Sequence, residues 1–129
     1  ESALSDKHRE KEAHYHLGIA FQNTYDYQKA ESHYRSAVGL DPDYSEAWNN
    51  LGVTLSVLGK PSEALAALVR AVDTGPNNVE AAVNLIRYLI QLGRIGDAQH
   101  RAEEAAARIP QSPEILALRD RLNASRLGP

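Results

Sequence analysis

The sequence predicts an all-α protein, a right-handed α-solenoid of seven helices arranged as antiparallel helix hairpins. The same residue types recur every 34 positions, and each 34-residue unit holds two segments with helical apolar periodicity. A proline closes each unit, where it stops the second helix. One hairpin cannot bury its own apolar face, so neighbouring hairpins are expected to stack. The repeating columns are Leu17, Leu51 and Leu85; Ala30, Ala64 and Ala98; Ala37, Ala71 and Ala105; and Pro42, Pro76 and Pro110.

The first part of the chain divides into an extension and one unit. Residues 1–10 are rich in charge and in good helix formers, so we expect a partly helical extension of the first helix, with residues 1–4 frayed. The alternative is that they are the end of a missing upstream unit. Residues 11–44 form the first unit. The chain starts without methionine, which indicates a piece of a longer protein.

The second unit, residues 45–78, is the most regular, with expected helices at about 46–58 and 62–74 separated by Gly59-Lys60-Pro61. The third, residues 79–112, departs most. Ile86 stands where the first two units have glycine, and Ala102 stands where they have a large residue. Because the two changes nearly conserve volume, we expect Ile86 to pack against the helix around Ala98 and Ala102 without a large void.

The C-terminal segment predicts a closing helix over residues 113–124, followed by a tail at 125–129. Ser112-Pro113-Glu114 is a strong helix start, with a cap, a proline at the first position and a carboxylate near the helix dipole. The helix offers leucines to the last hairpin and charged residues to water, as a terminal cap requires.

In these motifs the chain resembles the tetratricopeptide repeat family over residues 11–112, with the closing helix that such arrays have. The motif set is specific for the fold and unspecific for function. The residues that carry the resemblance in the first unit are Leu17-Gly18, Phe21, Tyr27, Ala30, Tyr34, Ala37 and Pro42. In the second unit they are Trp48, Leu51-Gly52, Leu55, Gly59, Ala64, Leu68, Ala71 and Pro76.

Composition narrows the classes of partner. The 129 residues are 43% hydrophobic, with a net charge of −3 from well-mixed acidic and basic residues. Nucleic acid is not expected as a partner, because phosphate binding needs a concentrated basic face. No apolar run is long enough to predict membrane insertion or a signal peptide. A soluble protein is expected, with the cytoplasm favoured over export, although the absence of cysteine leaves the compartment open.

No catalytic residues, metal ligands or cofactor site are predicted, so we do not expect an enzyme. The five histidines are scattered; His14 and His16 point to different faces of one helix, and His33 is expected to be exposed on another. The phosphate-loop resemblance of Gly59-Lys60-Pro61-Ser62 fails because the upstream glycine is missing and proline removes a donor.

The resemblance to the family implies a ligand groove on the concave face, formed by the first helix of each hairpin. Asn50 and Asn84 are 34 residues apart, and His16 precedes them in the same column. An amide has a donor and an acceptor, so it can hydrogen-bond an extended peptide backbone of any sequence; in the alternative, these amides bond within their own hairpins or to water. We expect Asn50 and Asn84 to be solvent-accessible and to share one concavity with Tyr15, Val53 and Arg87. The full set of expected groove residues is Tyr15, His16, Ile19, Asn49, Asn50, Val53, Val83, Asn84, Arg87 and Arg121.

A glutamate begins the first helix of each unit and the closing helix, at positions 12, 46, 80 and 114. A carboxylate in the first turn of a helix interacts favourably with the helix dipole, and this is the role that we expect for these glutamates. The alternative is that they form an acidic rim that selects basic ligands. Chaperone-binding members of the family clamp a C-terminal carboxylate, but Tyr15, Ile19 and Glu80 stand at three of the clamp positions and only Asn50 matches. A chaperone C-terminal tail is therefore not the expected ligand.

These observations predict a protein–protein interaction module that binds a peptide segment of a partner protein. Two alternatives stay open: a regulatory or substrate-recruiting domain of a larger enzyme, and a self-assembling scaffold. We expect a monomer, with any weak self-association through the N-terminal face.

Overall fold

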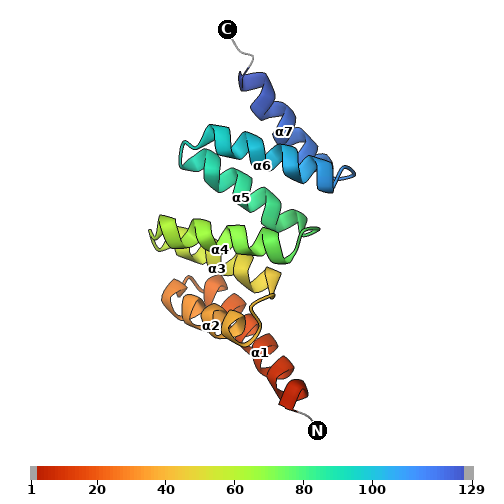
Figure 1. Ribbon diagram of the computed structural model, residues 1–129. Coiled ribbons are helices and arrows are strands. Elements are labelled where there is room, and N and C mark those ends of the chain that lie inside the picture. The colour runs from red at the N-terminus through yellow and green to blue at the C-terminus, as the bar shows by residue number, and fades with distance from the viewer. Residues whose placement is uncertain (1–2, 127–129) are drawn as a thin grey trace.

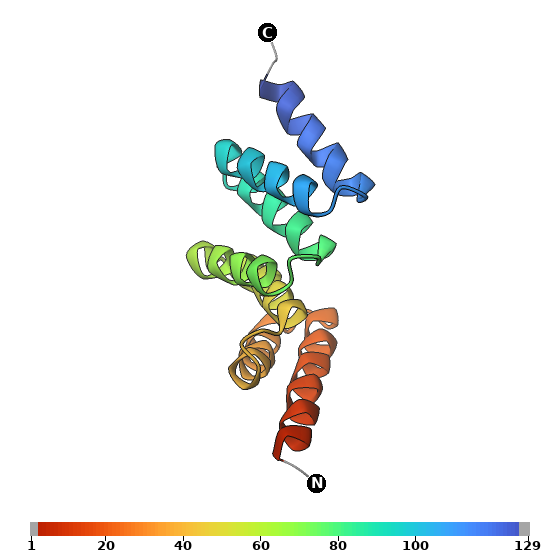
Figure 2. The same ribbon diagram turned by 45° about the vertical axis from the view of Figure 1, so that its right-hand side comes forward.

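The computed structural model describes residues 3–126, and within this range the chain forms seven α-helices and no strand (Figure 1). This confirms the predicted fold class. The hairpins stack along one long axis, with the two ends of the chain at opposite ends of the molecule (Figures 1 and 2). The helices are α1 (Ala3–Asn23), α2 (Tyr27–Leu40), α3 (Ser45–Val57), α4 (Pro61–Thr74), α5 (Val79–Gln91), α6 (Ile95–Arg108) and α7 (Pro113–Arg126).

Local sequence explains where the helices begin. The Asn78 side chain accepts a hydrogen bond from the backbone N–H of Ala81 at 3.1 Å and caps α5. The Ser112 hydroxyl does the same for α7, accepting from Ile115 N–H at 3.3 Å. Pro61 occupies the start of α4, where its missing N–H costs nothing.

The turns inside the three hairpins use the same left-handed backbone conformation. Gly59 and Gly93 have φ of 75° and 77°, and Tyr25, the equivalent residue of the first hairpin, has φ of 64°. Glycine adopts this conformation without steric cost, whereas tyrosine does so rarely. The shared turn keeps the 34-residue register through the hairpin that lacks the glycine.

The ends of the array differ in detail from the expectation. Residues 3–10 continue α1 without a break, so Ala3 and Leu4, expected to be frayed, are helical; Glu1 and Ser2 lie outside the described residues. Helix α7 reaches Arg126, two residues beyond the expected closing helix. Of the expected tail, residues 127–129 also lie outside the described part.

The stack has an inner and an outer side. Helices α1, α3, α5 and α7, here called the inner helices, contact one another in sequence along the stack, whereas α2, α4 and α6, the outer helices, contact inner helices only. Because the inner helices lie closer together, the described chain is concave on their side.

At the crossing inside the first two hairpins, glycine faces a large side chain. A Cβ atom added at Gly18 would lie 2.5 Å from Cε1 of Tyr34, and one added at Gly52 would lie 2.6 Å from Cγ of Leu68. In the third hairpin Ile86 and Ala102 are both fully buried in the hydrophobic core, as the predicted exchange of volume requires.

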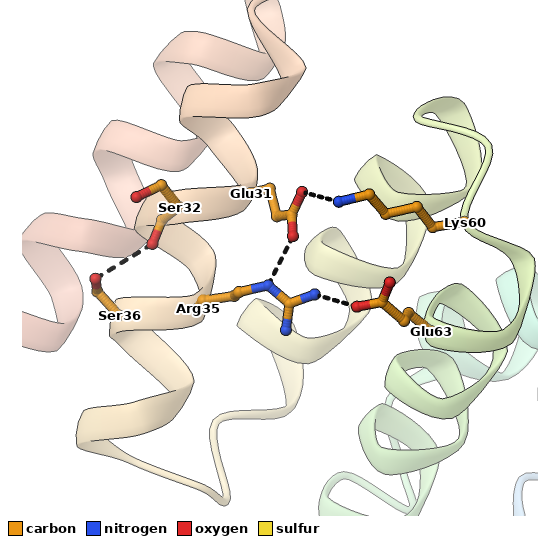
Figure 3. Close-up of polar contacts among 6 residues, drawn as sticks. All are labelled: Glu31, Ser32, Arg35, Ser36, Lys60 and Glu63. Carbon is orange, nitrogen blue, oxygen red and sulfur yellow. Dashed lines mark hydrogen bonds and ion pairs between the residues drawn. The ribbon is translucent and has the colours of Figure 1, made fainter.

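On the outer side, an ion-pair network joins the first hairpin to the second (Figure 3). The Glu31 carboxylate accepts from Lys60 Nζ at 3.1 Å and from Arg35 Nε at 2.7 Å. Arg35 Nη2 also donates to Glu63 at 2.7 Å. Beside this network, the Ser36 hydroxyl donates to the carbonyl of Ser32 at 3.2 Å. The network connects α2 to α4 although these helices do not pack directly.

Candidate functional site

A chain of asparagine side chains joins two inner helices on the concave side. Asn84 of α5 donates from Nδ2 to Oδ1 of Asn49 on α3 at 3.0 Å, and Asn49 Nδ2 makes a longer contact of 3.5 Å with Oδ1 of Asn50. Asn49 is only 1% exposed, whereas Asn50 and Asn84 are half-buried. The hydrogen bond from Asn84 to Asn49 therefore joins two hairpins, whereas the contact between Asn49 and Asn50 stays within α3. Asn50 and Asn84 are not fully buried.

The asparagine chain retains unused hydrogen-bonding capacity. Among the described residues, no donor pairs with Oδ1 of Asn84. Because its Nδ2 is held by Asn49, the orientation of this amide is set by the fold before any ligand arrives. At the other end, Asn50 acts on the hydroxyls of Tyr15 and Tyr34, where it opposes the rise of their pKa values, and the Tyr34 hydroxyl donates a hydrogen bond to Oε1 of Gln22 at 2.6 Å.

An aromatic cluster adjoins the asparagine chain toward the N-terminus. The Tyr15 ring lies 5.1 Å from the ring of Tyr44 and 6.2 Å from the ring of Tyr34, measured between centroids. Burial raises the pKa of Tyr34 and of Tyr44 to about 12 in each case. Tyr34 is fully buried and supports the cluster from inside the core, whereas Tyr15 and Tyr44 are half-buried and keep part of their rings accessible.

Besides burial, two glutamates from successive inner helices raise the pKa of the same residue of this cluster, Tyr15. Burial raises the pKa of Tyr15, and the carboxylates of Glu46 on α3 and Glu80 on α5 raise it further. Both glutamates are exposed, and neither forms an ion pair with another described residue. The middle of the concave face therefore combines aromatic surface, two amides and two unpaired negative charges.

The concave side is hollowed beside Asn84. This α5–α7 hollow is bordered by an ion pair between Arg87 Nη2 and Glu114 Oε2 at 3.4 Å. Val83, 3% exposed, forms its floor. The residues that line the hollow are Val79, Glu80, Val83, Asn84, Arg87 and Glu114.

The expected groove residues separate into three groups. Asn49 and Val83 are buried, so they support the surface and are not accessible for contact with a ligand. Arg121 is exposed on α7 and lines no hollow described here. The remaining expected residues, Tyr15, His16, Ile19, Asn50, Val53, Asn84 and Arg87, are half-buried or exposed and keep accessible surface.

Tyr44 belongs to the site but is absent from the expected set. It aligns at the 34-residue spacing with Asn78 and Ser112, which cap their helices, yet α3 has no side-chain cap. An aromatic residue at a capping position was the signal in the sequence. Its ring instead packs on Tyr15 and receives Lys11 Nζ at 5.0 Å from its centroid.

Family models described as tetratricopeptide repeat match residues 15–79 and residues 58–122, each about half of the chain. The chain belongs to the tetratricopeptide repeat family. As a member of this family, it is a protein-interaction module. The motif-based resemblance in the sequence is thereby confirmed.

Solved tetratricopeptide repeat domains share the fold over nearly the whole chain. The first such domain of Spaghetti (RPAP3), bound to the HSP90 peptide SRMEEVD, superposes with a TM-score of 0.78 at 15% identity, covering 93% of this chain and 95% of that one. The Arabidopsis OM64 domain gives a TM-score of 0.77 at 19% identity, covering 92% and 98%. At these identities the likeness establishes the fold alone.

Two curated relatives match this chain over different lengths. The peroxisomal targeting signal receptor of Eremothecium gossypii is 34% identical over 77 residues, which are 60% of this chain but only 14% of the receptor. The photosystem I assembly protein Ycf3 of Synechococcus sp. (strain WH7803) is 28% identical over 120 residues, covering 89% of this chain and 69% of that protein. The chain thus spans about one seventh of the receptor.

Within the described residues, none of the helices combines the length and apolarity needed to cross a bilayer. In the same part of the chain, no group of three or more histidine, cysteine, aspartate or glutamate side chains is placed to hold a metal ion.

Proposed function

We propose that the chain binds an extended peptide segment of a partner protein along its concave face. The observation that carries this proposal is the preoriented amide of Asn84, whose Oδ1 has no partner among the described residues. This oxygen accepts a backbone N–H of the ligand, and Asn50 supplies a second amide one helix away. Such contacts hold a peptide whatever its side chains are.

The surfaces on either side of the two amides suit peptide side chains. Toward the N-terminus, the rings of Tyr15 and Tyr44 offer an apolar and amphipathic surface. Toward the C-terminus, the α5–α7 hollow offers a depression next to Asn84. A bound segment would run across α1, α3 and α5, and its side chains would alternate between these surfaces and the solvent.

The charge of this face favours a ligand with lysine or arginine near its centre. Glu46 and Glu80 are exposed and have no ion-pair partner in the described part of the chain. Arg87, which borders the hollow, is already paired with Glu114. The HSP90 peptide bound by the RPAP3 domain ends in the acidic sequence EEVD. We propose that the present chain does not bind such a tail, because Glu80 would repel it.

The test begins with selection of binding peptides from a random displayed library, followed by titration of the wild-type chain and of an Asn50→Ala/Asn84→Ala variant. We expect the double variant to lose at least about tenfold in affinity, which corresponds to one or two hydrogen bonds. Asn23→Ala, at the exposed end of α1, is the matched control and should bind as the wild type does.

Two further results decide the proposal. The selected peptides should be enriched in lysine and arginine, and Glu46→Gln/Glu80→Gln should weaken their binding and its dependence on salt. Wild-type affinity in the asparagine double variant would contradict the proposed site. A chain that selects no peptide but associates with itself in light scattering would favour the scaffold alternative instead.

A further inference from the structure

Two histidines from different helices meet inside the first hairpin. Nδ1 of His14 on α1 lies 3.0 Å from Nδ1 of His33 on α2, and the ring centroids are 5.3 Å apart. Both side chains are half-buried, although His33 was expected to be exposed. The sequence separates these residues by 19 positions, and the hairpin turn brings their equivalent nitrogens together.

The neighbours of the pair restrict the His33 ring. Phe21 of α1 stacks on it with an interplanar angle of 9° and a centroid distance of 5.5 Å. Lys29 Nζ lies 5.4 Å from the centroid of Phe21. About a turn before His14 on α1, Lys11 pairs with Asp41 at the C-terminal end of α2 and helps hold the two helices in register. The two imidazoles therefore face each other in direct hydrogen-bond contact, with their positions set by the surrounding helices.

We propose that His14 and His33 form a site for a divalent transition metal of the copper or nickel type, with both Nδ1 atoms as ligands. Imidazole nitrogens bind such metals at about 2.0–2.1 Å, and with bonds of that length a separation of 3.0 Å corresponds to an angle of about 94° at the metal. This angle is that of neighbouring positions in square-planar or octahedral coordination. A tetrahedral zinc site would need the nitrogens about 3.3–3.4 Å apart.

The proton balance of the site is simple. Without metal, one Nδ1 carries a proton and donates it to the other Nδ1, as the 3.0 Å contact requires. With metal, both rings must carry their proton on Nε2, so the donor ring changes tautomer and two neutral rings release no proton. No third protein ligand is placed nearby among the described residues, so water completes the coordination shell. The bound ion links α1 to α2.

The test is a calorimetric titration of the 129-residue chain, free of any histidine tag, with nickel chloride at pH 7.5. We expect one nickel ion per chain. His14→Ala and His33→Ala should each weaken binding at least about tenfold, because a single imidazole loses the chelate. His16→Ala and His100→Ala, both at exposed histidines, are the matched controls and should bind within about twofold of the wild type.

The link that the metal ion makes between α1 and α2 can also be measured by thermal stability. At a free nickel concentration about ten times the dissociation constant, the Tm of the wild-type chain should rise by about 3–8 °C, and neither His14→Gln nor His33→Gln should show the rise. Copper should bind more tightly than nickel, and nickel more tightly than zinc. Unchanged nickel binding in either alanine variant, or no nickel binding by the folded wild type, would overturn the assignment. Tighter binding of zinc than of nickel would also contradict it.

Discussion

The first two hairpins and the third place different residues at the crossing between their two helices. In the first two, a glycine on the inner helix lets a large side chain of the outer helix reach the backbone; Gly18 faces Tyr34, and Gly52 faces Leu68. In the third, the large residue is Ile86 on the inner helix and the small one is Ala102 on the outer helix. The burial of both residues agrees with a crossing that depends on their combined volume and not on the identity of either.

The different residues at the third crossing are accompanied by a different approach of the two helices. Helices α5 and α6 approach each other less closely along their length than α1 and α2 or α3 and α4 do. A side chain on both helices keeps the backbones apart, whereas glycine lets them close up. The third hairpin nevertheless keeps the register of the array, and a tetratricopeptide repeat match extends across it over residues 58–122.

The largest expected effect comes from breaking the exchange in the third hairpin. Ile86→Gly restores the residue of the first two units but should destabilise the chain by about 3–5 kcal/mol, because it leaves a cavity in the core and adds a helical glycine. Urea denaturation followed by circular dichroism measures this change. Ile95→Gly, at the 39% exposed start of α6, is the matched control and should cost much less. A higher Tm for Ile86→Gly would refute the exchange of volume.

A smaller effect is expected from adding one carbon in the second hairpin. Gly52→Ala would place Cβ 2.6 Å from Leu68 Cγ and 3.2 Å from the carbonyl oxygen of Ala64. The overpacking should cost about 1–3 kcal/mol in spite of the better helix propensity of alanine. Gly39→Ala, where Cβ meets open space, should instead be neutral or stabilising by up to about 1 kcal/mol. If both substitutions had the same effect on urea denaturation, the close crossing would be contradicted.

The smallest effect is expected from acid, which breaks ion pairs in the first two hairpins. A hydrogen bond from Lys11 lowers the pKa of Asp41. Burial acts to raise the pKa of Glu31, but hydrogen bonds from Arg35 and Lys60 outweigh it, so this pKa is lowered as well. Both carboxylates join helices of the first two hairpins.

Because the folded pKa values lie below the unfolded ones, these carboxylates stabilise the chain above about pH 4–4.5 and lose this contribution as the pH falls through the folded values. Between pH 7 and pH 3, the unfolding free energy of Asp41→Asn/Glu31→Gln should therefore fall less than that of the wild type, by up to about 1 kcal/mol. Parallel pH profiles for the two chains would show that these pairs do not contribute.

The periodic part of the structure could be predicted from the sequence. Alanine, glycine and proline columns follow directly from helix packing and helix termination, so the hairpins could be predicted from spacing alone. The burial of Ile86 and Ala102 agrees with the exchange of volume, while their direct contact stays a prediction. The turn at Tyr25 shows the limit, because only the equivalent Gly59 and Gly93 indicate its left-handed conformation.

Side-chain contacts between neighbouring helices were harder to predict from the sequence. The hydrogen bond from Asn84 to Asn49 joins side chains of successive inner helices, and its direction depends on rotamers and on the angle between the helices. The same holds for His14 and His33, whose approach depends on the tilt of two helices in one hairpin. The column pattern placed Asn50 and Asn84 on one side of the stack, but it gave no means to distinguish the buried Asn49 from its neighbour.

The most direct test of the proposed peptide site is a nuclear magnetic resonance titration that follows the side-chain amide signals of the asparagines. The wild-type chain would be titrated with the tightest peptide from the library selection. The account predicts that the NH₂ signals of Asn50 and Asn84 shift with the same dissociation constant as the peptide, while that of Asn23 stays fixed. Shifts confined to the outer helices, with Asn50 and Asn84 unchanged at saturation, would contradict it.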